Sequence, residues 1–136
     1  MSQPYPAYPM PTEDADNAPY LRAWRHGVLL LQHCEACGRE IFYPRSMCPD
    51  CWASPLSWKE ASGHGTIVSF SLIYRPNHPA FLDEVPIALA EIALDEGASM
   101  LARVLGCAPQ IGMRVKMATD VEAVERYPLP AFRPLA

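Results

Sequence analysis

Cys34, Cys37, Cys48 and Cys51 form two C-x-x-C pairs that are separated by ten residues. This spacing constrains the fold of the chain more than any other feature of the sequence. Two residues between cysteines allow one tight turn to direct both sulfurs to a common point. Two such turns place four sulfurs at the corners of a tetrahedron, which is typical of a closed structural Zn(Cys)4 site. We therefore predict that these four cysteines bind zinc as a structural cofactor.

Two other interpretations of the cysteines stay open at this point. The cysteines could pair as disulfides or remain free thiols. The turns C-x-x-C-G and C-P-x-C also suit iron, which would permit one-electron transfer. Trp52 follows Cys51, where rubredoxin usually has glycine. We favour zinc, and because four thiolates leave no open position for water, the predicted role is structural and not catalytic.

Composition and charge limit the class of protein. The chain has 136 residues, of which 50% are hydrophobic and 19% charged, so it is expected to be globular. No apolar run reaches the length of a membrane helix, and the N-terminus lacks a signal-peptide pattern, so we expect a cytoplasmic protein without a membrane partner. The formal net charge of −4 argues against nucleic acid as a partner.

The chain divides into four predicted segments. Residues 1–18 are rich in proline and are expected to form a disordered tail. Residues 19–27 fit a short helix, with Asn17 as the N-cap and Gly27 at the left-handed stop position. Residues 28–58 fit a zinc ribbon, whose fold depends on its metal. Residues 59–136 form the remaining domain.

This remaining domain is predicted to be a five-stranded barrel of the OB type, which makes the whole protein mainly β. Five short segments alternate in polarity or are bounded by turn residues. They are residues 66–74, 87–94, 99–105, 112–117 and 129–133. Within the first of them, an apolar face is formed by Val68, Phe70, Leu72 and Tyr74.

Several motifs, in this order along the chain, resemble those of a known family. They lie at residues 34–38, 44–51, 58–67, 94–97, 111–115 and 129–134. The chain resembles the bacterial and archaeal acyl-CoA-associated family in which a rubredoxin-like zinc ribbon precedes an OB-fold. The similarity extends over residues 19–136.

This resemblance implies an accessory role. Members of the family typically accompany thiolase-like enzymes, including thiolases, acyl-CoA synthases and the aldolases of steroid side-chain breakdown. The implied function is a non-catalytic subunit of a hetero-oligomer that binds acyl-CoA and completes the active site of its thiolase-like partner. The alternatives are a nucleic-acid-binding module, since ribbons and OB-folds both serve that purpose, and a rubredoxin-like electron carrier.

No catalytic residues are predicted, because the sequence contains no general acid–base pair, nucleophile elbow or phosphate-binding glycine loop. A site for CoA requires cations for its phosphates and an aromatic surface for its adenine. The loop after the first barrel strand offers both, in Arg75 and Phe81. Three further cations are candidates for acyl-CoA binding: Arg45, Lys59 and Arg103.

Overall fold

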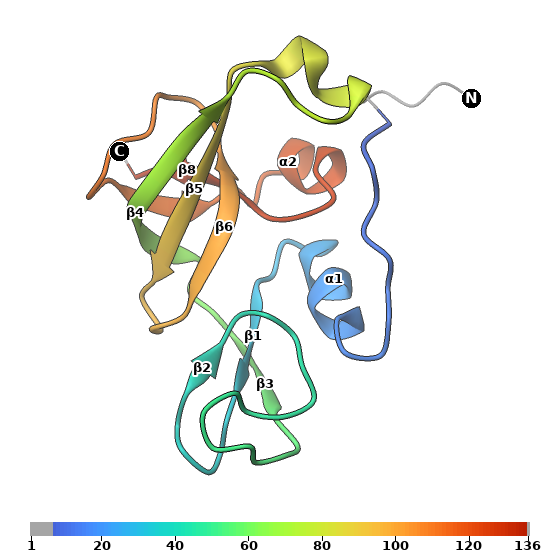
Figure 1. The fold of residues 1–136 in the computed structure, drawn as a ribbon, viewed down its shortest axis with the longest axis vertical. Coiled ribbons are helices and arrows are strands. Elements are labelled where there is room, and N and C mark those ends of the chain that lie inside the picture. The colour runs from blue at the N-terminus through green and yellow to red at the C-terminus, as the bar shows by residue number, and fades with distance from the viewer. Residues whose placement is uncertain (1–6, 136) are drawn as a thin grey trace.

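The computed structural model describes residues 7–135, and the first six positions of the expected tail lie outside this range. The elements follow one another as α1 (Ala18–Trp24), β1 (Leu30–His33), β2 (Glu40–Ile41), β3 (Ser57–Glu60), β4 (His64–Ile73), the 3-10 helix η1 (Pro79–Glu84), β5 (Ile87–Leu94), β6 (Ser99–Val104), β7 (Arg114–Met117), α2 (Val121–Arg126) and β8 (Ala131–Pro134). Figure 1 shows the ribbon at one end of the long axis and the barrel at the other. In the described range, no helix is long and apolar enough to cross a membrane.

Helix α1 begins after Asn17, as the sequence predicts, but the side chain of Asn17 does not cap it. The Asn17 side-chain oxygen instead accepts a hydrogen bond from the Asp14 backbone N–H, at 2.8 Å. The helix has only seven residues and is stabilised by packing, because isolated helices of this length are unstable in water. Its buried face carries Trp24, whose indole N–H donates to the Tyr127 carbonyl at 2.8 Å.

The ribbon is a three-stranded antiparallel sheet in the order β2-β1-β3. Gln32 in its central strand is 4% exposed, yet both ends of its side-chain amide are hydrogen-bonded. The side-chain nitrogen of Gln32 donates to the Arg45 carbonyl, and its oxygen accepts from the Arg45 backbone N–H, both at 2.8 Å. This pair of bonds fixes the loop between the two cysteine turns.

The second domain is a closed barrel in the order β4-β5-β6-β8-β7, which confirms the predicted five-stranded OB-type fold. Strands β6 and β8 pair in parallel, and the other neighbours pair antiparallel. Gly65 allows β4 to cross close to β5. A Cβ at Gly65 would lie 2.6 Å from the Cγ2 atom of Ile92 and 2.8 Å from the Ala93 carbonyl oxygen.

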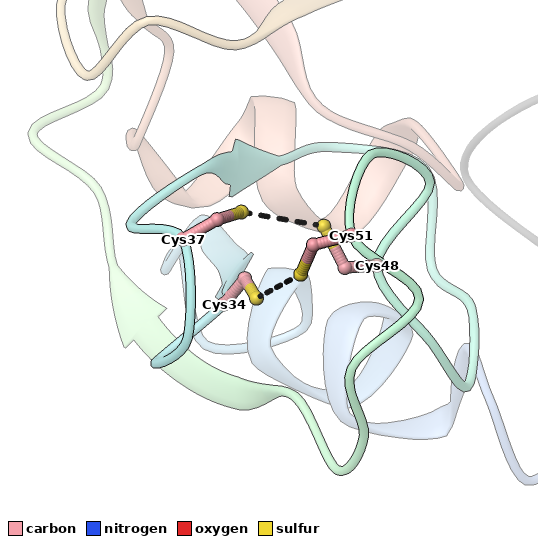
Figure 2. A group of neighbouring side chains, drawn as sticks. All are labelled: Cys34, Cys37, Cys48 and Cys51. Carbon is pink, nitrogen blue, oxygen red and sulfur yellow. Dashed lines mark hydrogen bonds between the residues drawn. The ribbon is translucent and has the colours of Figure 1, made fainter.

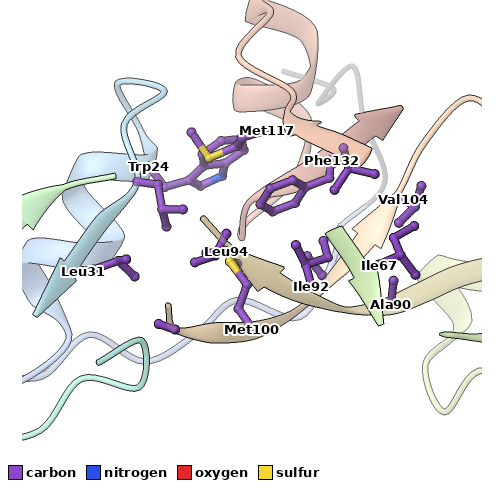
Figure 3. Packing of buried hydrophobic residues seen from close by; sticks show 14 of the residues in the cluster. Trp24, Leu31, Ile67, Ala90, Ile92, Leu94, Met100, Val104, Met117 and Phe132 are labelled. Atoms are coloured by element: carbon purple, nitrogen blue, oxygen red, sulfur yellow. The ribbon is translucent and has the colours of Figure 1, made fainter. Parts of the chain in front are cut away.

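One hydrophobic core joins the ribbon, α1 and the barrel. Trp24 and Leu31 pack in the same cluster as Met100 and Met117 of the barrel, and each is at most 5% exposed. Figure 3 shows these side chains converging between the two parts of the molecule. The ribbon is therefore a fixed extension of the barrel, since unfolding it would expose part of the shared core.

The fold leaves the four apolar residues of the predicted β4 face uncovered, but a register shift between Ile67 and Ser69 interrupts the alternation of the strand, and Tyr74 follows the end of β4 at Ile73. Val68, Phe70 and Leu72 are 40–42% exposed, and Tyr74 is 64% exposed. The cause is the length of the strands, because β7 pairs with β4 only along residues 64–66. Beyond Ile67, the outer edge of β4 therefore has no ladder partner in the part of the chain that the structure describes.

Two segments differ from what the sequence suggests. Helix α2 occupies a stretch to which the sequence analysis assigns no element, and its N-cap Asp120 accepts a hydrogen bond from the Ala123 N–H at 3.1 Å. Tyr8 falls in the stretch expected to be disordered, yet it is only 7% exposed. It is held there because its ring stacks on Phe81, with ring centroids 5.2 Å apart.

Candidate metal centre and candidate ligand-binding residues

The first cysteine turn is closed by two backbone hydrogen bonds. The carbonyl of Cys34 accepts from the Gly38 N–H at 2.8 Å, and the N–H of Cys34 donates to the Arg39 carbonyl at 2.9 Å. Gly38 has a φ of +80°, which is easily adopted only by glycine. This left-handed residue reverses the chain directly after Cys37, so that both sulfurs point to one side of the turn.

The second cysteine turn repeats this pattern. The carbonyl of Cys48 accepts from the Trp52 N–H, and the N–H of Cys48 donates to the Ala53 carbonyl, both at 3.0 Å. Trp52 takes the left-handed position with a φ of +67°. The two C-x-x-C motifs therefore fold as equivalent turns, as their shared spacing predicts.

The two turns bring the four sulfurs together, with all four Sγ atoms within 4.8 Å of one another. The Sγ atoms of Cys34 and Cys51 are 3.5 Å apart, and those of Cys37 and Cys48 are 3.6 Å apart. Figure 2 shows the four side chains pointing toward a common centre. Zinc–sulfur bonds of about 2.3 Å in a tetrahedron place sulfurs about 3.8 Å apart, so this donor set fits zinc. All four cysteines are free thiols in the structure.

Hydrogen bonds shift the thiol pKa values in opposite directions. The backbone N–H of Cys51 is the main cause that lowers the pKa of Cys48 to about 6. The backbone N–H of Cys37 likewise lowers the pKa of Cys34. At Cys37, the backbone N–H of Arg39 acts in the same direction, but hydrogen bonds with the neighbouring sulfurs outweigh it and raise the pKa to about 12. The sulfurs therefore share protons, and a divalent cation would replace these protons and hold all four as thiolates.

Side chains around the cluster connect its two turns. Arg39 of the first turn forms an ion pair with Asp50 of the second. Glu35 accepts a hydrogen bond from the Ser57 hydroxyl of β3 at 2.8 Å. His33, adjacent to the cluster, places its Nδ1 atom 2.6 Å from the Glu40 carboxylate and is not part of the sulfur group. In residues 7–135, these cysteines are the only group of potential metal ligands found.

Among the predicted acyl-CoA residues, the structure brings Phe81 and Arg103 together. The Arg103 guanidinium lies 5.7 Å from the centroid of the Phe81 ring. It also forms an ion pair with Glu84, whose other carboxylate oxygen accepts from the Tyr8 hydroxyl at 2.5 Å. The Tyr127 ring lies 4.8 Å from the same guanidinium. Arg103 therefore already has an anionic and an aromatic partner within the chain.

The three other candidates are dispersed. Arg75 is exposed at the end of β4, on the approach to η1, and forms no ion pair with any described residue. Lys59 is exposed on β3 of the ribbon. Arg45 lies in the ribbon loop, 5.9 Å from the centroid of the Tyr43 ring. Figure 1 places the ribbon and η1 at opposite ends of the molecule, so the five candidates do not form one site.

Sequence reasoning did not identify the network around Glu84. Its members are Tyr8, Glu84, Arg126 and Tyr127, together with the predicted Arg103. Arg126 donates from Nε to the Tyr8 hydroxyl at 3.1 Å. Tyr8 and Glu84 are 76 positions apart in the sequence, and neither belongs to a local motif that would indicate the contact.

A four-sulfur cluster on a small three-stranded sheet, followed by a closed five-stranded barrel, defines the chain as a zinc-ribbon and OB-fold protein. Residues 22–57 match the rubredoxin-like zinc ribbon domain of ChsH2, and residues 58–120 match the C-terminal OB-fold domain of ChsH2. The chain belongs to the ChsH2 family of DUF35 proteins. This membership, together with the cluster, supports a structural zinc ion.

Two relatives match different shares of the chain. A DUF35 domain-containing scaffold protein from Methanothermobacter thermautotrophicus is 34% identical over 78% of this chain and 80% of its own length. A probable enoyl-CoA hydratase alpha subunit from Thermomonospora curvata is 35% identical over 93% of this chain. The chain spans only 40% of the length of that hydratase subunit.

Two solved structures share the fold. A chain of the Ltp2–ChsH2(DUF35) aldolase superimposes with a TM-score of 0.74 and 32% identity, covering 91% of this chain and 98% of its own. A DUF35 family protein of unknown function from Sulfolobus solfataricus superimposes with a TM-score of 0.65 over 89% of this chain and 86% of its own. At 16% identity, this second similarity concerns the fold alone.

Proposed function

We propose that this chain is a non-catalytic accessory subunit that docks on a thiolase-like enzyme and helps to hold its acyl-CoA substrate. The observation that carries the proposal is the similarity, at 32% identity over 91% of the chain, to a chain of the Ltp2–ChsH2(DUF35) aldolase. The naming of two archaeal relatives as scaffold proteins supports the same role. The fixed connection between ribbon and barrel suits a scaffold, because it presents both domains to a partner as one rigid surface.

The uncovered face of β4 supports docking on a protein partner. We call Val68, Phe70, Leu72 and Tyr74 the β4 strip. All four are at least 40% exposed, and the strand edge beside them has no ladder partner among the described residues. Exposed apolar side chains next to an open strand edge favour association, because contact removes apolar area from water and satisfies free backbone groups.

The end of the barrel near η1 is our proposed acyl-CoA region. Arg75 follows the β4 strip directly and is an exposed cation without an ion pair in the described chain. We propose that it binds a CoA phosphate, because a guanidinium pairs well with phosphate oxygens. Phe81 and Arg103 support η1 at the same end of the barrel through their mutual contact. In this proposal, the zinc ion only fixes the ribbon, and the partner supplies the reacting groups.

Acyl-CoA titration tests this proposal. The chain is co-expressed with thiolase-like proteins of the same organism, and the affinity for an acyl-CoA is measured by calorimetry on the purified complex and on each component. We expect the complex to bind more tightly than either component. Arg75→Ala is expected to weaken binding about tenfold, which corresponds to the loss of one charge-assisted contact.

Lys116→Ala serves as the control, because Lys116 is also exposed but lies on β7. It is expected to leave the affinity unchanged. Equal affinity of the wild-type complex and the Arg75→Ala complex would exclude Arg75 from the ligand site. If the complex and the isolated partner bind acyl-CoA with equal affinity, no part of this chain belongs to the ligand site.

A further inference from the structure

An open groove of about 1480 Å³ lies between the ribbon and the barrel. One wall is the ribbon loop that carries Tyr43, and the opposite wall is the β5–β6 hairpin with Leu101. The N-terminal end of α1 closes the third side. Figure 1 shows the ribbon, the β5–β6 hairpin and α1 near the junction of the two domains. The shared core holds both walls in place, so the groove is a fixed feature of the fold.

The charges that line this groove are mainly negative. Its carboxylates belong to Asp14, Asp16, Glu40, Asp50, Glu91 and Glu96. Only two arginines oppose them, and one of these, Arg39, is already paired with Asp50. Glu40 lies 2.6 Å from the Nδ1 atom of His33. The four other carboxylates, of Asp14, Asp16, Glu91 and Glu96, form no ion pair with a described residue, so the groove keeps an excess of negative charge.

Glu96 is a groove residue with one carboxylate oxygen shielded from water. One of its carboxylate oxygens accepts a hydrogen bond from the Ser62 backbone N–H at 2.8 Å. The other oxygen is shielded from water and has no hydrogen-bond partner among the described residues. A carboxylate oxygen that is shielded from water and lacks a partner is energetically unfavourable, and its negative charge adds to the acidic character of the groove.

The groove also exposes large apolar side chains. Tyr43 is 70% exposed, Leu101 is 65% exposed and Leu129 is 47% exposed. The groove therefore combines exposed apolar side chains with carboxylates. This combination differs from a metal site, which requires carboxylates that converge on one point and has no use for exposed leucines.

We propose that this groove binds a segment of the partner protein that carries lysine or arginine next to apolar side chains. The proposal rests on the accessory role proposed above, and it adds to the β4 strip a second docking surface with a different chemistry. Charge complementarity selects the occupant, because cations on the partner would pair with the unneutralised carboxylates and speed association. The same charges disfavour CoA in this groove, because its phosphates are anionic.

A charge-reversal experiment on the complex tests the docking site. Asp16→Lys combined with Glu91→Lys reverses two groove carboxylates on different walls. The control combines Glu60→Lys with Glu125→Lys, which are exposed acids outside the groove. Zinc content and circular dichroism establish that each variant is folded. The dissociation constant with the thiolase-like partner is then measured at low and at high salt.

We expect the groove variant to bind the partner at least about tenfold more weakly at low salt, and the control within about twofold of wild type. Wild-type affinity should fall as salt increases, while that of the groove variant should vary less. Tyr43→Ser should weaken binding without altering the salt dependence, because it removes apolar contact alone.

Three results would overturn the inference. If the wild-type chain forms the complex and the groove variant binds equally well, docking occurs elsewhere and the accessory function stands. If the free wild-type chain is a dimer by light scattering and the groove variant is a monomer, the groove binds a second copy of this chain. If the wild-type chain forms no complex at all, the proposed function fails, and this inference fails with it.

Discussion

Trp52 occupies the position in the second cysteine turn that Gly38 occupies in the first. Both residues follow the second cysteine of a C-x-x-C pair, and their φ angles are +67° and +80°. Glycine adopts this left-handed conformation without strain, whereas a residue with a Cβ incurs a cost of roughly 1–2 kcal/mol. The side chain of Trp52 is 73% exposed, so burial within the chain does not offset that cost.

Trp52→Gly should therefore stabilise the zinc-loaded chain, by about 1 kcal/mol according to the left-handed backbone preference. Thermal unfolding monitored by circular dichroism at fixed zinc concentration measures the change. Gly38→Ala is the matched opposite test, since a Cβ at Gly38 would meet no atom within 4 Å. It should destabilise the protein by a similar amount through the backbone alone. Equal stability of Gly38→Ala and wild type would refute this explanation.

Zinc removal should unfold the ribbon. We expect one zinc per chain, a colourless protein, and loss of the ribbon on treatment with a strong chelator, because structural zinc contributes on the order of 10 kcal/mol of binding free energy. Trp24 lies in the core shared by ribbon and barrel, so its fluorescence should shift to the red when the ribbon unfolds.

Cys37→Ser should abolish stoichiometric zinc binding, whereas Cys107→Ser should not, because Cys107 is outside the cluster. A red protein with thiolate-to-iron absorption would contradict the assignment of zinc.

Gly65→Ala should be strongly destabilising for a steric reason. The added methyl group would lie 2.6 Å from the Cγ2 atom of Ile92, which is fully buried and has no room to move. We expect a loss of about 2 kcal/mol or more in the free energy of unfolding, as for overpacked cores. Urea denaturation measures it, with Ser71→Ala on the exposed part of the same strand as the control. If Gly65→Ala leaves the unfolding midpoint unchanged, β4 and β5 are less closely packed at Gly65 than the structure shows.

Glu84 should make stability dependent on pH in the acid range. Partial burial raises the pKa of its carboxyl, but hydrogen bonds from Tyr8 and Arg103 outweigh this effect and bring the pKa below its usual value of 4.5. Because the folded-state pKa is below the unfolded one, the stabilisation is fully present above the unfolded value. It is lost as the pH falls through the folded-state pKa.

Glu84→Gln should therefore lower stability near pH 7 and reduce the further loss of stability as the pH falls below the usual carboxyl pKa of 4.5. Denaturant titrations at several pH values compare it with Glu122→Gln, an exposed acid on α2. A Glu84→Gln protein with the same acid dependence as wild type would show that this network does not determine the titration.

The metal cluster could be predicted from sequence because its geometry is local. Each C-x-x-C pair closes its own turn through bonds between residues four or five positions apart. The barrel strands could be predicted for a similar reason, since alternation of polar and apolar residues follows from the pleat of a strand. The exposure of Phe70 could not be predicted from the sequence, because it depends on where β7 stops pairing with β4.

Other features depend on contacts between distant segments. The burial of Tyr8 results from stacking on Phe81 and hydrogen bonding to Glu84. The six residues of α2 are too few for a helical period to be recognised against the surrounding loop. The acidic groove combines α1, the ribbon loop and the β5–β6 hairpin, which are separate in the sequence. Only the folded structure places its carboxylates together.

The account is tested most directly by the mass and the activity of the complex. The chain is mixed with the thiolase-like proteins of its own organism, and size-exclusion chromatography with light scattering determines the mass of each species. We predict a hetero-oligomer that contains both proteins, and no thioester turnover by the isolated chain. A chain that remains separate from every such protein, and that converts an acyl-CoA by itself, would contradict the account.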